Sequence, residues 1–185
     1  KMMIVKAMSG APGGAQAWSV YHASLGNDKF LVLNSTDAEG DGSTDWNSTS
    51  PTDTLFTVGN ANRTNGSGGT YVAYVWCDVV GFSKFGSYTG NGNADGAFIY
   101  TGFKPSFVMV KKTSATNNWV MMDNKRDPFN MMTEYLLAND NTAEGTGLNF
   151  DFLSNGFKLK SNSGGTNTLA GTYIYMAFAE NPFVS

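Results

Sequence analysis

An internal repeat is the feature that most constrains the fold of this chain, because two copies of one unit must bury their apolar faces in the same way. Five short segments recur in the same order: residues 3–6 with 108–111, 18–20 with 119–121, 30–34 with 135–139, 56–58 with 157–159 and 69–72 with 171–174. The third pair is followed in both copies by the tripeptide Ala-Glu-Gly, at 38–40 and 143–145. Ordered matches of this kind indicate a duplication.

The repeat divides the chain into a first unit at 1–82, a connecting segment at 83–104 and a second unit at 105–185. The connecting segment contains two short strand candidates, 84–89 and 97–101, around a loop rich in Gly and Asn, which readily adopt positive φ. We therefore expect a connecting β-hairpin. The two units are expected to form either separate domains or one continuous sandwich.

The strand candidates predict an all-β fold with two internally duplicated units. Each copy holds about five apolar runs rich in β-branched and aromatic residues, separated by polar turns. Residues 157–160 alternate apolar and charged, so Phe157 and Leu159 should face a core and the two lysines water. Residues 71–77 and their copy 173–179 are apolar on both faces and should lie in the middle of a sheet. A layered β-sandwich follows.

Charge and length exclude two classes of partner. The formal net charge of −3 and the absence of a Lys/Arg run argue against nucleic acid. The most apolar stretches are far shorter than the roughly 20 residues that a membrane-spanning helix requires, which argues against membrane insertion.

No catalytic residue stands out. His22 is the sole histidine and Cys77 the sole cysteine, so the chain has neither a Cys/His cluster nor an intrachain disulfide. The repeat places Ala179 at the position of Cys77, which predicts a small core residue rather than a nucleophile. The protein is expected not to be an enzyme. A glycan depolymerase with two converging carboxylates is the enzymatic alternative, although no pair among the acids is singled out.

A candidate for a metal site lies in the first copy. Its loop contains oxygen ligands broken by glycines, as calcium sites do: Asp37, Glu39, Asp41 and Asp45. The spacing is not that of an EF-hand, and the second copy keeps only Glu144. A solvated loop is the favoured interpretation, and no cofactor is expected.

Aromatic residues provide the candidate ligand contacts. Trp18 and Trp119 recur at the same strand and are expected in the core. Four other rings lie in or beside polar loops, where a flat ring can contact a sugar: Trp46, Tyr88, Tyr100 and Phe103.

The repeat also carries a family resemblance. Its landmarks are Tyr-Thr-Gly-Phe-Lys-Pro-Ser-Phe-Val-Met-Val-Lys at 100–111, Asn-Trp at 118–119, Gly-Thr-Tyr-Val-Ala-Tyr at 69–74 and Gly-Ser-Tyr-Thr-Gly-Asn-Gly at 86–92. Together they resemble a repeat domain found, often in tandem, in tail-fibre and other virion proteins of phages, marine ones especially. The resemblance implies a lectin-like or jelly-roll-like β-sandwich. It also implies a location at the virion surface or outside the cell. The first copy lacks the Gly-Phe-Lys-Pro lead-in of 102–105, so we expect residues upstream of Lys1 in the full protein.

Three functional hypotheses follow. The first is a non-catalytic tail-fibre module that binds host-surface glycan through its loop aromatics. The second is a purely structural fibre or capsid-decoration protein, a homo-oligomer that assembles with other virion proteins through its β edges. The third and least favoured is the depolymerase.

Overall fold

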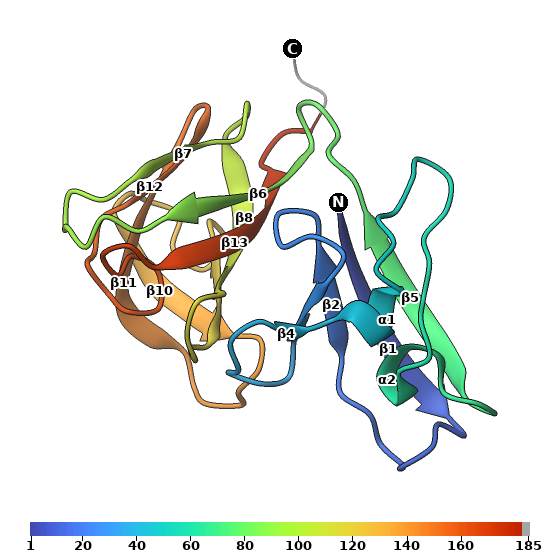
Figure 1. Ribbon diagram of the computed structural model, residues 1–185. Helices are drawn as coiled ribbons and strands as arrows, with labels where there is room; N and C mark the ends of the chain where they lie inside the picture. The colour runs from blue at the N-terminus through green and yellow to red at the C-terminus, as the bar shows by residue number, and fades with distance from the viewer. Residues whose placement is uncertain (183–185) are drawn as a thin grey trace. The chain divides into compact units, whose positions relative to one another are not determined.

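The computed structural model describes residues 1–182 and consists of two antiparallel sheets joined by loops (Figure 1). Two compact units contain one sheet each, Lys1–Trp76 and Cys77–Ser185. Helical structure in the described residues is limited to two four-residue turns. The all-β prediction is confirmed.

Unit 1 is a five-stranded sheet in the order β4-β3-β2-β1-β5. Its elements are β1 (Met2–Ser9), β2 (Ser19–His22), β3 (Lys29–Val32), β4 (Gly40–Asp41), α1 (Ser43–Trp46), α2 (Asn62–Asn65) and β5 (Thr70–Trp76). One face of the sheet packs into a core of Met3, Val5, Tyr21 and Trp46, flanked by two half-buried rings.

Unit 2 is an eight-stranded sheet in the order β6-β13-β8-β9-β10-β11-β12-β7. Its strands are β6 (Ser83–Thr89), β7 (Phe98–Tyr100), β8 (Pro105–Lys112), β9 (Trp119–Asp123), β10 (Met132–Leu137), β11 (Gly145–Leu153), β12 (Gly156–Leu159) and β13 (Thr172–Ala179). The sheet curls into a nearly closed barrel (Figure 1), so that Tyr88 from one end contacts Phe157 near the other, with ring centroids 6.4 Å apart. Phe157 and Leu159 are fully buried and Lys158 is not, as predicted.

The two units share one pairing register. Lys6 pairs with Val72 and Lys111 with Ile174, displaced by the repeat offsets (111 − 6 = 105; 174 − 72 = 102). The other ladders agree in the same way. Ile4 pairs with Val20 as Met109 pairs with Met121, and Ser19 pairs with Val32 as Val120 pairs with Leu137. Phe30 likewise pairs with Gly40 as Tyr135 pairs with Gly145. Strands β5-β1-β2-β3-β4 therefore correspond to β13-β8-β9-β10-β11, and four of the five matched segments lie on equivalent strands. The fifth match is not borne out, because residues 56–58 form no strand whereas 157–159 lie in β12.

The repeated Ala-Glu-Gly tripeptide has a packing explanation. Its glycine stands opposite an aromatic residue of the neighbouring strand, Phe30 in one unit and Tyr135 in the other. A Cβ added at Gly40 would lie 2.6 Å from the Phe30 ring, and one at Gly145 would overlap Tyr135. The ring lies across the glycine in each case, so a larger residue cannot replace it without repacking.

The connecting segment differs from the expected hairpin. Both strands form, but β6 pairs with β13 and β7 with β12, at opposite ends of the sheet of unit 2. An isolated hairpin has too little apolar area to be stable by itself. Tyr88 and Ile99 instead pack into the core of unit 2, which incorporates the segment.

The prediction for residues 71–77 is corrected, although that for their copy is confirmed. β13 lies between β6 and β8, whereas β5 pairs with β1 alone among the described residues. β5 ends at Trp76, and Cys77 is exposed rather than in the core. The difference arises because no strand at 1–182 takes the place of β6 in unit 1.

Candidate functional site

Trp46 is a core residue rather than a ligand contact. Its side chain is completely buried and meets Tyr21 edge to face, with ring centroids 5.7 Å apart. Its indole N–H donates to the carbonyl of Lys29 at 2.9 Å. The structure therefore removes Trp46 from the predicted set, because the ring has no open face.

Tyr88 and Phe103 also pack inward. The Tyr88 ring stacks on Tyr173 at a centroid distance of 5.0 Å, and its hydroxyl donates to the carbonyl of Thr166 at 2.7 Å. Burial raises the pKa of Tyr88 well above its usual value, and the neighbouring Tyr173 adds to the effect. Phe103 belongs to the same core. Phe103 is therefore buried and Tyr88 half-buried, and both rings pack against the core of unit 2 rather than standing out from a loop.

Tyr100 is the one predicted aromatic residue that the structure leaves exposed, and it has a neighbour that the sequence reasoning missed. Tyr100 is 64% exposed and Phe98 45%, while Ile99 between them is buried. Alternate residues of a strand share a face, so both rings lie on the outer face of β7. The alternation at 98–100 is the signal that would have identified Phe98.

The strand next to β7 leaves room for the Phe98 ring. Gly156 of β12 pairs with Tyr100, and a Cβ added to it would lie 2.9 Å from the Phe98 ring. The end of β7 is also held in place, because Thr101 and Gly102 donate their N–H groups to the carbonyl of Asn155 at 3.0 and 3.2 Å.

Charged groups border the two rings. Lys158 of β12 pairs with Phe98, and its ammonium lies 2.6 Å from the carboxylate of Asp95. The hydrogen bond and the charge of Lys158 lower the pKa of Asp95, so this exposed acid is ionised at neutral pH. We call Phe98, Tyr100, Gly156, Lys158 and Asp95 the β7 platform. It offers two apolar rings beside a hydrogen-bond donor and an acceptor.

The acidic loop does not assemble into a metal site. No group of three or more His, Cys, Asp or Glu side chains at 1–182 is placed to hold a metal ion. The four acids have separate partners: Asp37 with Ser35, Glu39 with Lys29, Asp41 with Ser43 and Asp45 with Arg63.

His22 is likewise structural in its placement. It lies in β2 with 1% of its surface exposed. Its Nδ1 accepts the N–H of Ser24 at 3.2 Å.

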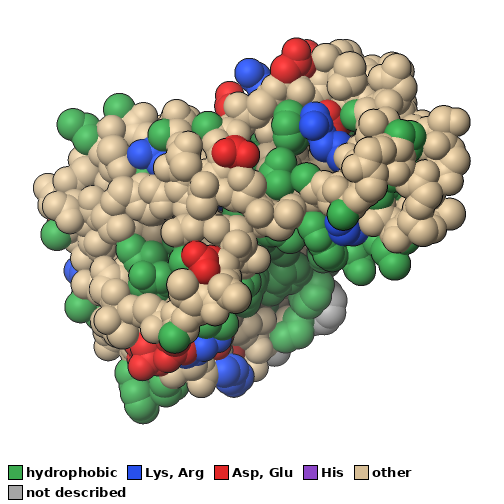
Figure 2. All heavy atoms as spheres, turned by 90° about the horizontal axis from the view of Figure 1, so that it is seen from below, with side chains coloured by type: hydrophobic (Ala, Val, Ile, Leu, Met, Phe, Trp, Pro, Cys, Tyr) green, Lys and Arg blue, Asp and Glu red, His purple; other side chains and the backbone are tan. Residues whose placement is uncertain are grey.

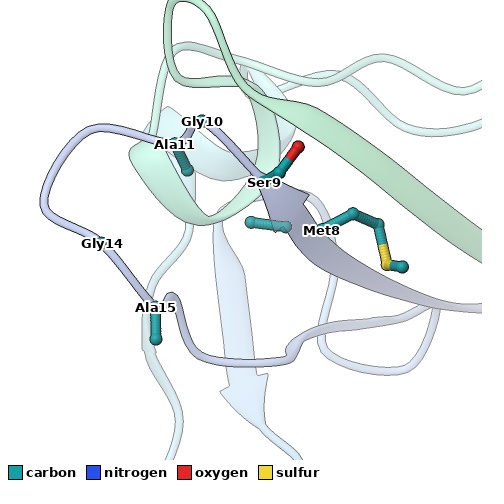
Figure 3. Close-up of a pocket in the computed structure, with 7 residues that line it drawn as sticks. Met8, Ser9, Gly10, Ala11, Gly14 and Ala15 are labelled. Atoms are coloured by element: carbon teal, nitrogen blue, oxygen red, sulfur yellow. The ribbon is translucent and has the colours of Figure 1, made fainter.

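A pocket of about 270 Å³ lies at the end of β1 and in the loop after it (Figure 3). Its lining is composed of Ala7, Met8, Ser9, Gly10, Ala11, Gly14 and Ala15. The only side-chain hydroxyl among these, that of Ser9, is 2.8 Å from the hydroxyl of Thr70. The pocket therefore presents backbone groups, apolar side chains and one hydroxyl, and no ionisable side chain.

Among the described residues, no helix has the length and apolarity that crossing a membrane would require. The fold and surface define a two-unit all-β protein with an exposed aromatic platform. The chain belongs to the family described as a domain of unknown function (DUF7483), whose family model matches residues 1–182. No curated protein matches the chain, and no solved structure matches it.

Proposed function

We propose that the protein is a non-catalytic module of a virion appendage of the tail-fibre type and that it binds host-surface glycan through the β7 platform. The observation that carries the proposal is the pair of exposed rings on one face of β7, Phe98 and Tyr100. The virion setting and the surface location rest on the resemblance of the repeat landmarks.

The chemistry of the platform suits a sugar. Exposed large apolar side chains that lie together mark binding surfaces. The C–H face of a sugar ring packs on a flat aromatic ring, and its hydroxyls can accept from Lys158 and donate to Asp95. Charged residues make up only 15% of the chain, and on the one face drawn in Figure 2 they are scattered among polar and apolar side chains, which favours a neutral ligand.

The backbone beneath the platform is anchored at several points, which lowers the entropic cost of binding. β7 is anchored by the buried Ile99, by its ladder with β12 and by the turn that Asn155 holds. The strand that carries the rings therefore needs no ordering of its backbone when a ligand binds.

A glycan-array screen of the purified chain tests this function. We expect saturable binding to a defined set of neutral glycans and at least a tenfold loss of affinity in Tyr100→Ala and in Phe98→Ala. Tyr74→Ala is the matched control, because Tyr74 is a comparably exposed aromatic residue on a strand of unit 1, and it should bind normally. Absence of binding to every glycan, or binding that survives both platform substitutions, would contradict the proposal.

A further inference from the structure

The outer edge of β5 is the strongest unassigned feature of the molecule. β5 and β13 are equivalent strands with the same register to their first neighbours, β1 and β8. The other side of β13 is covered by β6, whereas no strand at 1–182 pairs with the other side of β5. The occupied edge in unit 2 therefore indicates what fits the open edge in unit 1.

The backbone groups on the open edge can be identified from β13. The carbonyl of Thr172 accepts the N–H of Thr113, which follows β8, at 2.9 Å, so Thr172 faces the β8 side. The N–H of Ala179 donates to the carbonyl of Phe82, which precedes β6, at 2.8 Å, so Ala179 faces the β6 side. Alternate residues of a strand direct their backbone groups to opposite sides. The residues of β13 that face β6 are thus Tyr173, Tyr175 and Ala177. Subtracting the offset of 102 identifies the groups on the open edge of β5 as those of Tyr71, Ala73 and Val75.

The side chains of β5 lack the usual protection of an edge strand. Soluble proteins guard such edges with charges, prolines or bulges, and Thr70–Trp76 contains no charge and no proline. Tyr74 is 46% and Val75 55% exposed, whereas their equivalents Met176 and Ala177 are buried. A strand paired with this edge would cover Tyr74 and Val75, whose equivalents in unit 2 are buried.

A second part of the binding surface beside β5 lies in α2. In unit 2 the buried Asn167 holds the loop that follows β6: its Nδ2 donates to the side chain of Asn91 at 3.0 Å and to the carbonyl of Asn93 at 2.8 Å. Its Oδ1 accepts the N–H of Asn91 at 2.9 Å. The equivalent residue of unit 1 is Asn65 (167 − 102 = 65), which is exposed. Asn65 thus stands where such a loop would be held.

We infer that the β5 edge of unit 1 binds, in antiparallel orientation, a strand-and-turn segment with the chemistry of residues 83–96, supplied by a partner chain in which that segment is not already paired as β6 is with β13. The donated strand pairs with Tyr71, Ala73 and Val75. An aromatic ring at the position of Tyr88 stacks on Tyr71 as Tyr88 stacks on Tyr173, and the Gly-Asn turn that follows bonds to Asn65. This inference concerns assembly and does not depend on glycan binding at β7.

The test is a titration of a fluorescently labelled peptide of residues 83–96 with the whole chain, followed by anisotropy. We expect saturable binding that falls at least tenfold in Ala73→Pro, which removes an N–H from the open edge and leaves the β1 ladder intact. Val75→Lys, which places a charge on the edge without changing the backbone, should weaken binding comparably. A peptide with Tyr88→Ala should bind severalfold more weakly.

Three results would overturn the inference. The first is no saturation with the peptide, and the second is undiminished binding by the folded Ala73→Pro and Val75→Lys variants. The third is a protein that does not bind the peptide but shows a doubled mass in light scattering, which Val75→Lys abolishes. The last result would show that β5 pairs with itself in a second copy. Tyr100→Ala should bind the peptide normally, so failure of this inference and failure of the glycan proposal are separable.

Discussion

Tyr71 and Tyr173 hold the same corner in the two units. In each, the hydroxyl accepts a backbone N–H from five residues upstream, at 2.7 and 2.8 Å, and donates to a carbonyl nine residues upstream, at 2.7 and 3.0 Å. The glycine two residues before each tyrosine lies under its ring, because an added Cβ would be 2.7 Å from the ring at Gly69 and 3.1 Å at Gly171. The repeated Gly-Thr-Tyr is therefore a structural corner that turns the chain into β5 and β13.

Removing one hydroxyl should measure the contribution of this corner. We expect Tyr173→Phe to lower the free energy of unfolding by about 1–3 kcal/mol, because it leaves a backbone N–H without its acceptor in a buried setting. Tyr71→Phe should cost less, since Tyr71 is only half-buried. Urea denaturation measures both, and Tyr100→Phe on the exposed platform should change stability by less than about 0.5 kcal/mol. Equal stability of Tyr173→Phe and the unaltered protein would show that the corner contributes nothing.

The buried ion pair of unit 1 predicts a larger effect. Asp45 is completely buried, receives Arg63 through both carboxylate oxygens at 2.5 and 2.6 Å, and accepts the Ser19 hydroxyl at 2.9 Å. Arg63→Ala would leave a buried carboxylate without its partner, and we expect a loss of about 3–5 kcal/mol in thermal or urea unfolding.

The exposed pair between Lys29 and Glu39, at 3.7 Å, is the matched control for that substitution. Lys29→Ala should cost at most about 1 kcal/mol, because solvent screens an exposed pair. If Arg63→Ala were as mild as Lys29→Ala, the Asp45 carboxylate would have to be solvated rather than buried.

Alkaline pH should destabilise unit 2 through its buried tyrosines. Burial, with a further contribution from the charge of Asp78, raises the pKa of Tyr175 from 10.0 to about 12. An unfolded tyrosine loses its proton near pH 10 while the folded one keeps it, so the unfolded state binds fewer protons between these values. The free energy of unfolding should therefore be unaffected below pH 10 and fall above it, by about 1.4 kcal/mol per pH unit for this group.

Urea unfolding at several pH values between about 8 and 12 measures that slope. Tyr175→Phe should make it shallower, and Tyr88→Phe should do the same, because burial also raises the pKa of Tyr88. Tyr100→Phe, in an exposed position, should leave the slope unchanged. An unaltered slope in both buried variants would mean that neither tyrosine keeps its proton in the folded state.

The duplication was predictable from the sequence because it is recorded in local patterns. Side-chain alternation identified Phe157 and Leu159 as core residues, and the offsets between matched segments predicted which strands correspond. The glycine of Ala-Glu-Gly was recognisable as a repeated landmark. Its reason, an aromatic ring lying across it from the neighbouring strand, became visible only with the pairing of β3 and β4.

The candidate site was predicted only in part, because exposure depends on partners distant in the sequence. Trp46 follows a polar loop, yet Tyr21 and Lys29 enclose its ring. Residues 71–77 and 173–179 have nearly the same apolar pattern, and only the presence of β6 separates a central strand from an edge strand. No local pattern records whether such a neighbour exists, so the β5 edge had to be found in the structure.

Amide hydrogen exchange along β5 and β13 tests most directly the central claim that unit 1 is the open form of the unit that β6 completes. The account predicts fast exchange at Ala73 and Val75, whose N–H groups face the open edge, and slow exchange at Tyr175 and Ala177, which face β6. Val72 and Tyr74, which face β1, provide the internal control and should exchange slowly. Equal protection of Ala73 and Val75 with Tyr175 and Ala177 would contradict the account, because it would mean that the β5 edge is already occupied.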